Sequence, residues 1–197
     1  MLSALIDGSS SFKLDLAHQV IIAEIGTEIQ GSWVNLIGQG AARNVEEMIL
    51  QQARRHRWLQ KSHRTVLRAG RKRRRQLELF LRNGWRIIFS SEPDVAVYDS
   101  KGVLRAAVEI KGSMDKAGAQ TRYGEAKKSF SKALRENPRC ETFYLASCFT
   151  QAVLQQIKED GQVRQVFNLA DVLSNVSRRQ EFLDELFTYV IRINSDG

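Results

Sequence analysis

The chain has 197 residues, a length that suits one domain of ordinary size and lets the fold bury about 70% of the surface that the unfolded chain exposes. Its apolar fraction of 43% and charged fraction of 26% are typical of a folded globular protein and exclude an intrinsically disordered chain. No apolar stretch approaches the roughly 18 residues that a membrane-spanning helix needs, and no basic segment followed by a long apolar stretch marks a secretion signal. The composition therefore predicts a cytoplasmic protein without a membrane partner.

The positive charge of the chain is concentrated in one region. The net charge is +8, and the segment from Arg43 to Arg86 contains fourteen Lys or Arg and three acidic residues, a net charge of +11, so the rest of the chain carries −3. This segment includes the basic run Arg71-Lys72-Arg73-Arg74-Arg75. Because like charges this close repel one another unless phosphates neutralise them, the region predicts nucleic acid binding. A charged surface in water and a localisation signal are the alternatives.

Helical patterns dominate the first part of the chain. Apolar residues at helical spacing after a serine run predict a helix over residues 13–30, and a second helical pattern begins near Ala41. A third helix is predicted over residues 63–82, where it would contain the basic run and end at Asn83-Gly84. Residues 1–70 are accordingly predicted to form a helical N-terminal part.

From Trp85 the apolar pattern changes to that of strands. Strands are predicted over 85–90, 94–99 and 104–111, with the tight turn Asp99-Ser100-Lys101-Gly102 between the last two. The pattern then predicts a glycine-containing loop over 112–120, a helix over 121–137, a strand over 141–148, and helices over about 150–160 and 178–190. The simplest organisation is a single α/β domain over 1–197, with a catalytic core at 71–148 and a helical C-terminal part at 149–197.

Two carboxylates and an ammonium group are predicted to share one small site. Glu109 and Lys111 project from the same face of their strand, because strand side chains repeat every two residues. Pairing across the hairpin can bring Asp94 beside Glu109. Two adjacent carboxylates raise each other's pKa unless a divalent cation or a lysine neutralises them. Mg²⁺ suits such a site, since it is held by one or two carboxylates, water and phosphate oxygens.

The sequence Glu92-Pro93-Asp94, fourteen residues, then Glu109-Ile110-Lys111 resembles the PD-(D/E)XK nuclease superfamily over residues 71–148, and more loosely over 41–148. The resemblance implies an α/β, restriction-endonuclease-like core, a mixed central sheet flanked by helices, here with extra N-terminal helices. It implies that Asp94, Glu109 and the main-chain carbonyl of Ile110 hold Mg²⁺, with Mn²⁺ as a substitute. It also implies that Lys111 orients or deprotonates the attacking water.

An E-x-K triplet alone is a weak signal, because it arises by chance about once in 300 positions. Its alternative interpretation is that Glu109 and Lys111 lie on the solvated face of an edge strand, paired for a few tenths of a kcal/mol. Three further features favour the nuclease interpretation: a Pro-Asp pair that opens the neighbouring strand, an apolar opposite face and the basic region upstream.

Many members of this superfamily carry a further acidic residue on the first core helix. Glu46, near a glycine-led helix start, is the first candidate for that position, with Glu47 beside it. Glu78 is the alternative, because it lies in the segment directly before the first core strand. An acid in the first helical turn or an ordinary surface acid also explains Glu46.

The segment after the E-x-K strand predicts contacts with DNA. The sequence E-I-K-G-S-x-D-x-A-G-A followed by E-A-K-K-S-F resembles type II restriction endonucleases of the XcyI-like group. A glycine-rich loop that leads into a helix N-terminus is also a natural phosphate site. A solvated helix face is the alternative for the basic residues of that helix. The candidate DNA-binding residues are Arg71, Arg73, Arg74, Ser113, Arg122 and Lys127.

Together these features predict a Mg²⁺-dependent endonuclease that hydrolyses phosphodiester bonds of double-stranded DNA, most simply a type II restriction endonuclease. A homodimer is expected, because cutting both strands of a palindrome needs two identical sites related by a two-fold axis. A repair or junction-resolving nuclease of the same superfamily is one alternative. A non-catalytic nucleic-acid-binding protein is the alternative from another class.

Overall fold

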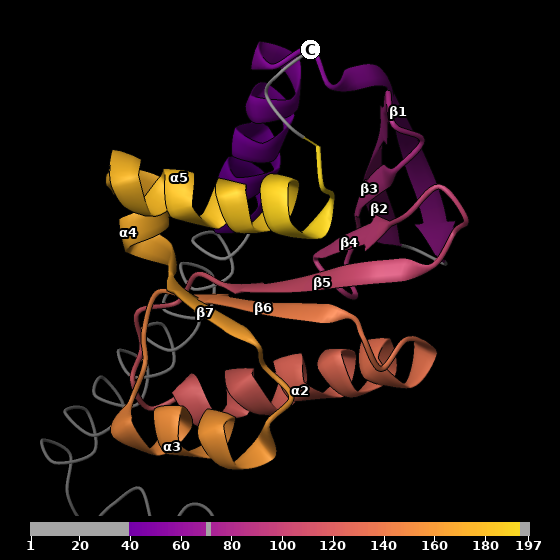
Figure 1. Cartoon of the computed structure of the whole chain (residues 1–197). Coiled ribbons are helices and arrows are strands. Elements are labelled where there is room, and N and C mark those ends of the chain that lie inside the picture. Colours follow the sequence, from indigo (N-terminus) through magenta and orange to yellow (C-terminus); the bar gives the residue numbers. More distant parts are fainter. Residues whose placement is uncertain (1–39, 70–71, 194–197) are drawn as a thin grey trace, which may run out of the picture. The chain divides into compact units, whose positions relative to one another are not determined.

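The strands of the chain pair into one seven-stranded mixed sheet, flanked by helices on both faces (Figure 1). The computed structural model describes residues 40–69 and 72–193, with side chains described for 40–66 and 76–193, and all of these residues belong to one compact unit, Gly38–Gly197. The strand order along the sheet follows the chain. The strands are β1 (Leu59–Ala69), β2 (Lys72–Leu81), β3 (Arg86–Phe89), β4 (Val95–Tyr98), β5 (Leu104–Lys111), β6 (Glu141–Ala146) and β7 (Gln165–Asn168).

The direction of the strands divides the sheet into two parts. Strands β1 to β5 form an antiparallel meander, whereas β5, β6 and β7 are parallel. Parallel neighbours need crossover connections, which α2 (Ala119–Glu136) and α3 (Gln151–Asp160) supply on one face of the sheet (Figure 1). A helix over residues 40–55, α4 (Leu169–Ser174), α5 (Val176–Asp184) and the π-helix η2 (Glu185–Val190) complete the described part. The predicted α/β architecture is thus confirmed.

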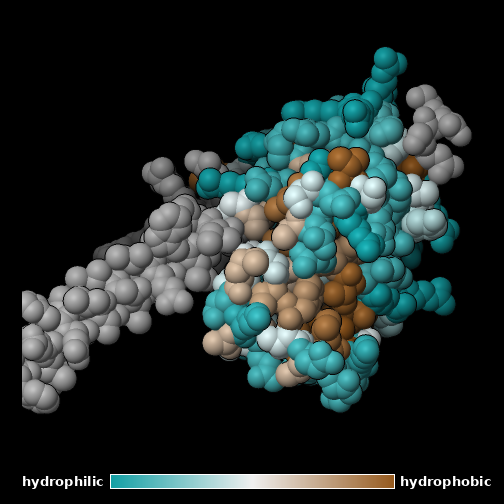
Figure 2. Space-filling model, turned by 90° about the vertical axis from the view of Figure 1, so that its left-hand side faces the viewer, coloured by the Kyte–Doolittle hydropathy of each residue, from teal (hydrophilic) through white to brown (hydrophobic). Residues whose placement is uncertain are grey.

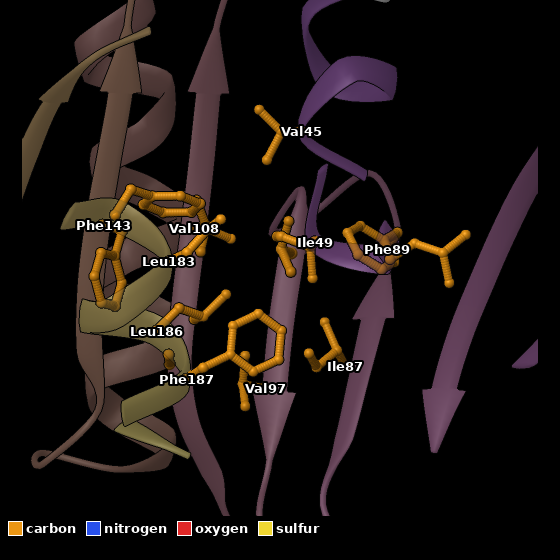
Figure 3. Close-up of a cluster of buried hydrophobic side chains, with 14 of the residues drawn as sticks. Val45, Ile49, Ile87, Phe89, Val97, Val108, Phe143, Leu183, Leu186 and Phe187 are labelled. Atoms are coloured by element: carbon orange, nitrogen blue, oxygen red, sulfur yellow. The ribbon is translucent and has the colours of Figure 1, made fainter. Parts of the chain in front are cut away.

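The larger hydrophobic core lies between the sheet and the layer formed by the 40–55 helix, α5 and η2 (Figure 3). There the 40–55 helix contributes Val45 and Ile49, and the sheet contributes Val97 and Val108. A second cluster lies on the other face, where aromatic rings of α2 and β6 pack together, among them Phe130 and Tyr144. Each large apolar side chain buried in this way stabilises the fold by about 1.5–3 kcal/mol. Strands β5 and β6 are therefore covered on both faces.

The turn between β4 and β5 matches its prediction. The Asp99 carboxylate accepts hydrogen bonds from the backbone N–H groups of Lys101 and Val103, both at 2.9 Å, and from the Arg105 guanidinium at 2.8 Å. Gly102 has a φ of 78°, a conformation that suits glycine. The turn sets the register of the hairpin, and this register places the ends of β4 and β5.

The helix predicted over residues 63–82 is wrong, because this segment forms most of the β1–β2 hairpin. Leu77, Leu79 and Leu81 are buried, whereas Glu78 and Phe80 between them are half-buried. This is a period of two, the repeat of a strand with one buried face. Leu77, Leu81 and the intervening Phe80 also fit a helical spacing, and that coincidence accounts for the error.

Most other predicted elements are present. The helix predicted near Ala41 is confirmed as residues 40–55, and the later helices and strands match α2, β6, α3 and the pair α5 and η2. Strand β7 and helix α4 were not predicted. The helix predicted over 13–30 lies outside the described residues. Within residues 40–69 and 72–193, every helix is too short or too polar to cross a lipid bilayer.

Candidate active site

Asp94 and Glu109 are neighbours across two adjacent strands. In the β4–β5 pair Val95 lies opposite Val108, so the antiparallel register places Asp94, directly before β4, beside Glu109. The loop that carries Asp94 is closed by two hydrogen bonds of Ser90, whose N–H donates to the Asp94 carbonyl at 3.1 Å and whose hydroxyl donates to the Pro93 carbonyl at 2.9 Å. The hairpin thus brings together the two carboxylates that the sequence predicted as neighbours.

Lys111 lies between the two carboxylates. Its Nζ is 2.7 Å from Oε2 of Glu109 and 3.8 Å from Oδ2 of Asp94. The same Oδ2 accepts a hydrogen bond of 2.7 Å from the backbone N–H of Ile110. Asp94, Glu109 and Lys111 therefore form one cluster at the C-terminal end of β5.

Burial and mutual repulsion disturb the protonation of this cluster. Glu109 is only 3% exposed, and its burial, together with the nearby charge of Asp94, raises the pKa of Glu109. Burial also raises the pKa of Asp94, although Lys111 and the Ile110 N–H work against the rise. Burial lowers the pKa of Lys111, but the charges of Glu109 and Asp94 outweigh it, so this pKa is raised. Lys111 is therefore protonated at neutral pH.

The alternative of a solvated edge strand is wrong. Strand β5 lies inside the sheet, between β4 and β6, and α2 packs against it. A buried carboxylate costs free energy unless it is paired and hydrogen-bonded. Glu109 and Lys111 therefore form a partly buried ion pair inside the sheet, not a loose pair on a solvated edge strand.

The cluster fits a hard divalent cation. Two carboxylates and one ammonium group leave one net negative charge, and each carboxylate has one oxygen for which the structure shows no hydrogen bond. Mg²⁺ prefers such oxygen ligands and needs only one or two carboxylates beside water and phosphate. Among the residues that the structure describes, no group of three or more His, Cys, Asp or Glu is close enough to hold a metal. The ligands available are thus Asp94, Glu109 and main-chain oxygens.

Comparison with known proteins agrees with this geometry. The family of the XcyI restriction endonuclease matches residues 1–148, about three quarters of the chain. The chain belongs to the XcyI restriction endonuclease family. The matched region includes Asp94, Glu109 and Lys111, and it ends just after β6. The mixed sheet between helices is the restriction-endonuclease-like fold that the sequence predicted. A search of curated proteins finds no match.

In this member of the XcyI family, three acidic residues were predicted as candidates for a further metal ligand. Each of them forms a hydrogen bond with a residue outside the cluster of Asp94, Glu109 and Lys111. Within the described residues none of them joins Asp94 and Glu109 in a cluster of three acids. The role of Glu46 stays a prediction. The pairs are Glu46 with Arg64 at 3.3 Å, Glu47 with Gln51 at 3.1 Å and Glu78 with Arg86 at 3.1 Å.

The loop after β5 is organised by Asp115. Its carboxylate accepts hydrogen bonds from the backbone N–H groups of Ala117 at 3.0 Å and Gly118 at 2.9 Å, so an internal anion occupies the end of the loop before α2. Arg122, a predicted DNA contact, donates to the Asp115 carbonyl and lies 3.7 Å from its carboxylate. Ser113, another predicted contact, is buried, and its hydroxyl accepts from the Asp115 N–H at 3.3 Å. Both side chains therefore support the loop.

The remaining predicted DNA contacts lie on other elements. Lys127 donates to Asp160 of α3 at 2.7 Å, so its charge is compensated within the protein. Arg73 and Arg74 lie in β2, where the backbone register places them opposite Arg68 and Leu67. Their side chains and the whole of Arg71 lie outside the described residues. All of these DNA contacts stay predictions.

Two polar residues of α2 were missed by sequence reasoning. Glu125 contributes to the raised pKa of Lys111, and Ser129 partly offsets the raised pKa of Glu109. With Arg122 they occupy positions i, i+3 and i+7 of one helix, a spacing that places them along one face. This spacing was visible in the sequence, but it shows only that they share a face, and the packing of α2 on β5 shows which face.

Proposed function

We propose that this chain is a type II restriction endonuclease that acts in the cytoplasm and hydrolyses phosphodiester bonds of double-stranded DNA with Mg²⁺. The observation that carries the proposal is the cluster of half-buried Asp94 and Lys111 with buried Glu109, in a member of a restriction endonuclease family. The cluster combines a pair of oxygen ligands for a cation with a protonated donor. Hydrolysis of a phosphodiester needs both, because negative charge grows on the phosphate during the reaction.

The proposed roles follow from the position of each group. Asp94, Glu109 and the carbonyl of Ile110 would hold Mg²⁺, with Mn²⁺ as a substitute. Bound Mg²⁺ would supply positive charge to the phosphate and lower the pKa of a water molecule. The N–H of Ile110 fixes the orientation of the Asp94 carboxylate through its 2.7 Å hydrogen bond.

Lys111 is proposed to orient the attacking water. Its raised pKa favours the ammonium form, which donates hydrogen bonds and does not accept a proton. The ammonium group lies within reach of both carboxylates, so it can also face a phosphate that approaches them. In the metal-free cluster the ammonium form therefore suits orientation of water, the first of the two roles implied by the resemblance.

The β1–β2 hairpin is proposed to hold the DNA backbone. Strand β2 pairs with β3 only between Leu77 and Phe80, whereas its pairing with β1 continues to Ala69 and Lys72. The outer half of the hairpin is therefore a two-stranded ribbon beyond the sheet, and it contains most of the basic run. A ribbon of this kind fits a groove of duplex DNA, and Arg71, Arg73 and Arg74 are proposed to bind phosphates there.

We also propose a homodimer, which supplies one active site for each DNA strand. Figure 2 shows apolar side chains gathered in the middle of one face and surrounded by hydrophilic ones. Exposed large apolar residues of the described part include Leu154, Val166 and Val176, which lie outside the catalytic core, and Val103 and Met114, which lie within it. Apolar surface of this kind marks interaction sites on soluble proteins.

The proposal is tested by incubating the protein with phage DNA and Mg²⁺ and then sequencing the ends of the products. A type II restriction endonuclease gives discrete fragments with the same sequence at every end. Cleavage confined to branched or damaged DNA would identify a repair or junction-resolving nuclease. Retained DNA binding without any cleavage would identify a non-catalytic binding protein and overturn the proposal.

A further inference from the structure

Ser129 has a buried hydroxyl group without a hydrogen-bond partner. The residue lies in the middle of α2 and is only 3% exposed. Among the described side chains its Oγ is the one fully buried polar atom that forms no hydrogen bond. Serines inside helices usually bond a carbonyl one turn earlier or face water. Ser174 shows the first behaviour, with a 2.7 Å hydrogen bond to the Ala170 carbonyl.

The surroundings of Ser129 relate this hydroxyl to the candidate active site. Helix α2 packs on β5, the strand that carries Glu109 and Lys111. The hydroxyl lies close enough to Glu109 to oppose the rise in the pKa of that carboxyl. It nevertheless completes no hydrogen bond, and Lys111 is the side chain that donates to this carboxylate, at 2.7 Å from Oε2. A buried donor without a partner, beside a buried carboxylate, calls for an explanation.

We infer that Ser129 is a positioning residue, whose hydroxyl donates a hydrogen bond to the Glu109 carboxylate when a divalent cation is bound. This inference rests on the proposed function, since it assigns the cation to Asp94 and Glu109. It adds a residue of α2 to a site otherwise built from β4 and β5.

The physical reason is that the Glu109 carboxylate competes with water and phosphate for the ammonium group of Lys111. A divalent cation beside Asp94 and Glu109 repels the ammonium group, and the proposed role of Lys111 requires it to face water and phosphate. Glu109 then loses the hydrogen bond that now satisfies Oε2. A serine hydroxyl can turn toward the carboxylate by rotation about one bond, without movement of the backbone. Ser129 thus holds the Glu109 carboxylate in place while the ammonium group of Lys111 contacts water and phosphate.

The experiment compares metal binding and thermal stability of Ser129→Ala with the wild type, without DNA. Binding is measured with Mn²⁺ from the loss of the electron paramagnetic resonance signal of free Mn²⁺. Partners that orient metal ligands typically contribute 10–100-fold to affinity, so we expect the half-saturating Mn²⁺ concentration to rise by about this factor. The melting temperature of the metal-free variant should be unchanged or higher, because the substitution removes a buried hydroxyl without a partner.

Ser131→Ala is the matched control on the same helix. The Ser131 hydroxyl donates to Oε1 of Gln162 at 2.8 Å and so joins α2 to another segment. This control should lower the melting temperature and leave the half-saturating Mn²⁺ concentration as in the wild type. The comparison separates a loss of packing in α2 from a loss of metal affinity.

Each failure has a separate signature. Unchanged Mn²⁺ affinity in Ser129→Ala, with a wild type that binds Mn²⁺, would overturn the role of Ser129 and leave the proposed function intact. A lower melting temperature with unchanged affinity would do the same and would assign Ser129 to packing. A wild type that neither binds Mn²⁺ nor cleaves DNA would overturn the proposed function itself.

Discussion

Lys111 carries one positive charge between two carboxylates, so the metal-free cluster keeps one net negative charge in a largely buried place. Such a cluster repels the phosphate backbone of DNA. Bound Mg²⁺ would bring the net charge to +1 and reverse the sign of the interaction. On the proposed function, DNA binding at this site therefore depends on a cation held by Asp94 and Glu109.

The two cysteines should differ in reactivity. Both are free thiols, but Cys140 is fully buried and Cys148 is partly exposed. Burial raises the pKa of the Cys140 thiol to about 12, so almost no reactive thiolate forms at pH 8. We predict that a thiol reagent at pH 8 labels Cys148 and leaves Cys140 unmodified until the protein unfolds, as mass spectrometry of peptides can show. Equal labelling of both residues in the folded protein would contradict the burial of Cys140.

The central residues of the site could be predicted from the sequence because they depend on local geometry. A strand places residues two apart on one face, and a four-residue turn sets which residues of a hairpin lie opposite each other. These two rules bring Asp94 to Glu109 and Lys111. Ser129 and Glu125 could not be assigned in this way, since their approach to β5 depends on how α2 packs against the sheet.

The β4–β5 turn should stabilise the hairpin through the charge of Asp99. Burial raises the pKa of Asp99, but hydrogen bonds from Val103, Arg105 and Lys101 outweigh it and hold the pKa below 3.8. Hydrogen bonds to charged groups contribute about 1.5–3 kcal/mol each. We therefore predict that Asp99→Asn lowers the free energy of unfolding by about 1–3 kcal/mol at pH 7, measured by urea denaturation.

The pH dependence of this effect has a definite sign. A carboxyl whose pKa is lower in the folded state stabilises the fold above its unfolded pKa, and the contribution is lost as the pH falls through the folded pKa. The difference between wild type and Asp99→Asn should thus shrink below about pH 3.8. Asp171→Asn, a substitution at an exposed acid of α4, serves as the control and should show little difference at either pH. Equal stability of Asp99→Asn and wild type at pH 7 would refute this role.

The elements of the fold could be predicted where the apolar period was unambiguous. The alternation in β5 and the helical spacing in α2 are clear, and both elements were predicted within two residues of their observed ends. The segment of β1 and β2 has mixed spacing and many long basic side chains, which favour either structure. Its strands depend on pairing with β3 and on burial of Leu77, Leu79 and Leu81, which are tertiary effects. Strand β7 has only four residues and gives no clear period.

The β1–β2 ribbon should bind phosphates more than it reads bases. Each Lys or Arg that neutralises a phosphate releases a counterion, so log affinity falls by about 0.9 per contact for each unit of log salt concentration. We predict that replacing Arg71, Arg73 and Arg74 together by Gln reduces this slope by up to about 2.7. The measurement is a salt titration of duplex binding with Ca²⁺ in place of Mg²⁺. Cognate and random duplexes should change alike, because phosphates carry no sequence information directly.

A triple substitution with the same change of charge controls for the effect of net charge alone. Lys132, Arg135 and Arg139 are exposed near the C-terminal end of α2, and their replacement by Gln should leave the slope close to that of the wild type. An unchanged slope in the ribbon variant would show that the DNA lies against another surface.

The whole molecule should act as a homodimer. A single copy of 22.4 kDa holds one cluster of Asp94, Glu109 and Lys111, and a palindrome has one scissile bond in each strand. We predict that sedimentation of the protein on cognate duplex gives twice the monomer mass and that both strands are cut within one complex. A monomer both free and on cognate duplex, with one strand nicked per event, would contradict the dimer.

The rate of DNA cleavage by Asp94→Asn in Mg²⁺, measured in a single turnover, is the most direct test of the proposed active site. Asp171→Asn provides the matched control, since the same substitution occurs there at an exposed acid of α4 that belongs to another element. Asp94→Asn should cleave at least about a hundredfold more slowly than the wild type, because it removes a charged ligand of the cation, while duplex binding in Ca²⁺ survives. Asp171→Asn should cleave at the wild-type rate. Near-normal Mg²⁺-dependent cleavage by purified Asp94→Asn would contradict the assignment of the active site.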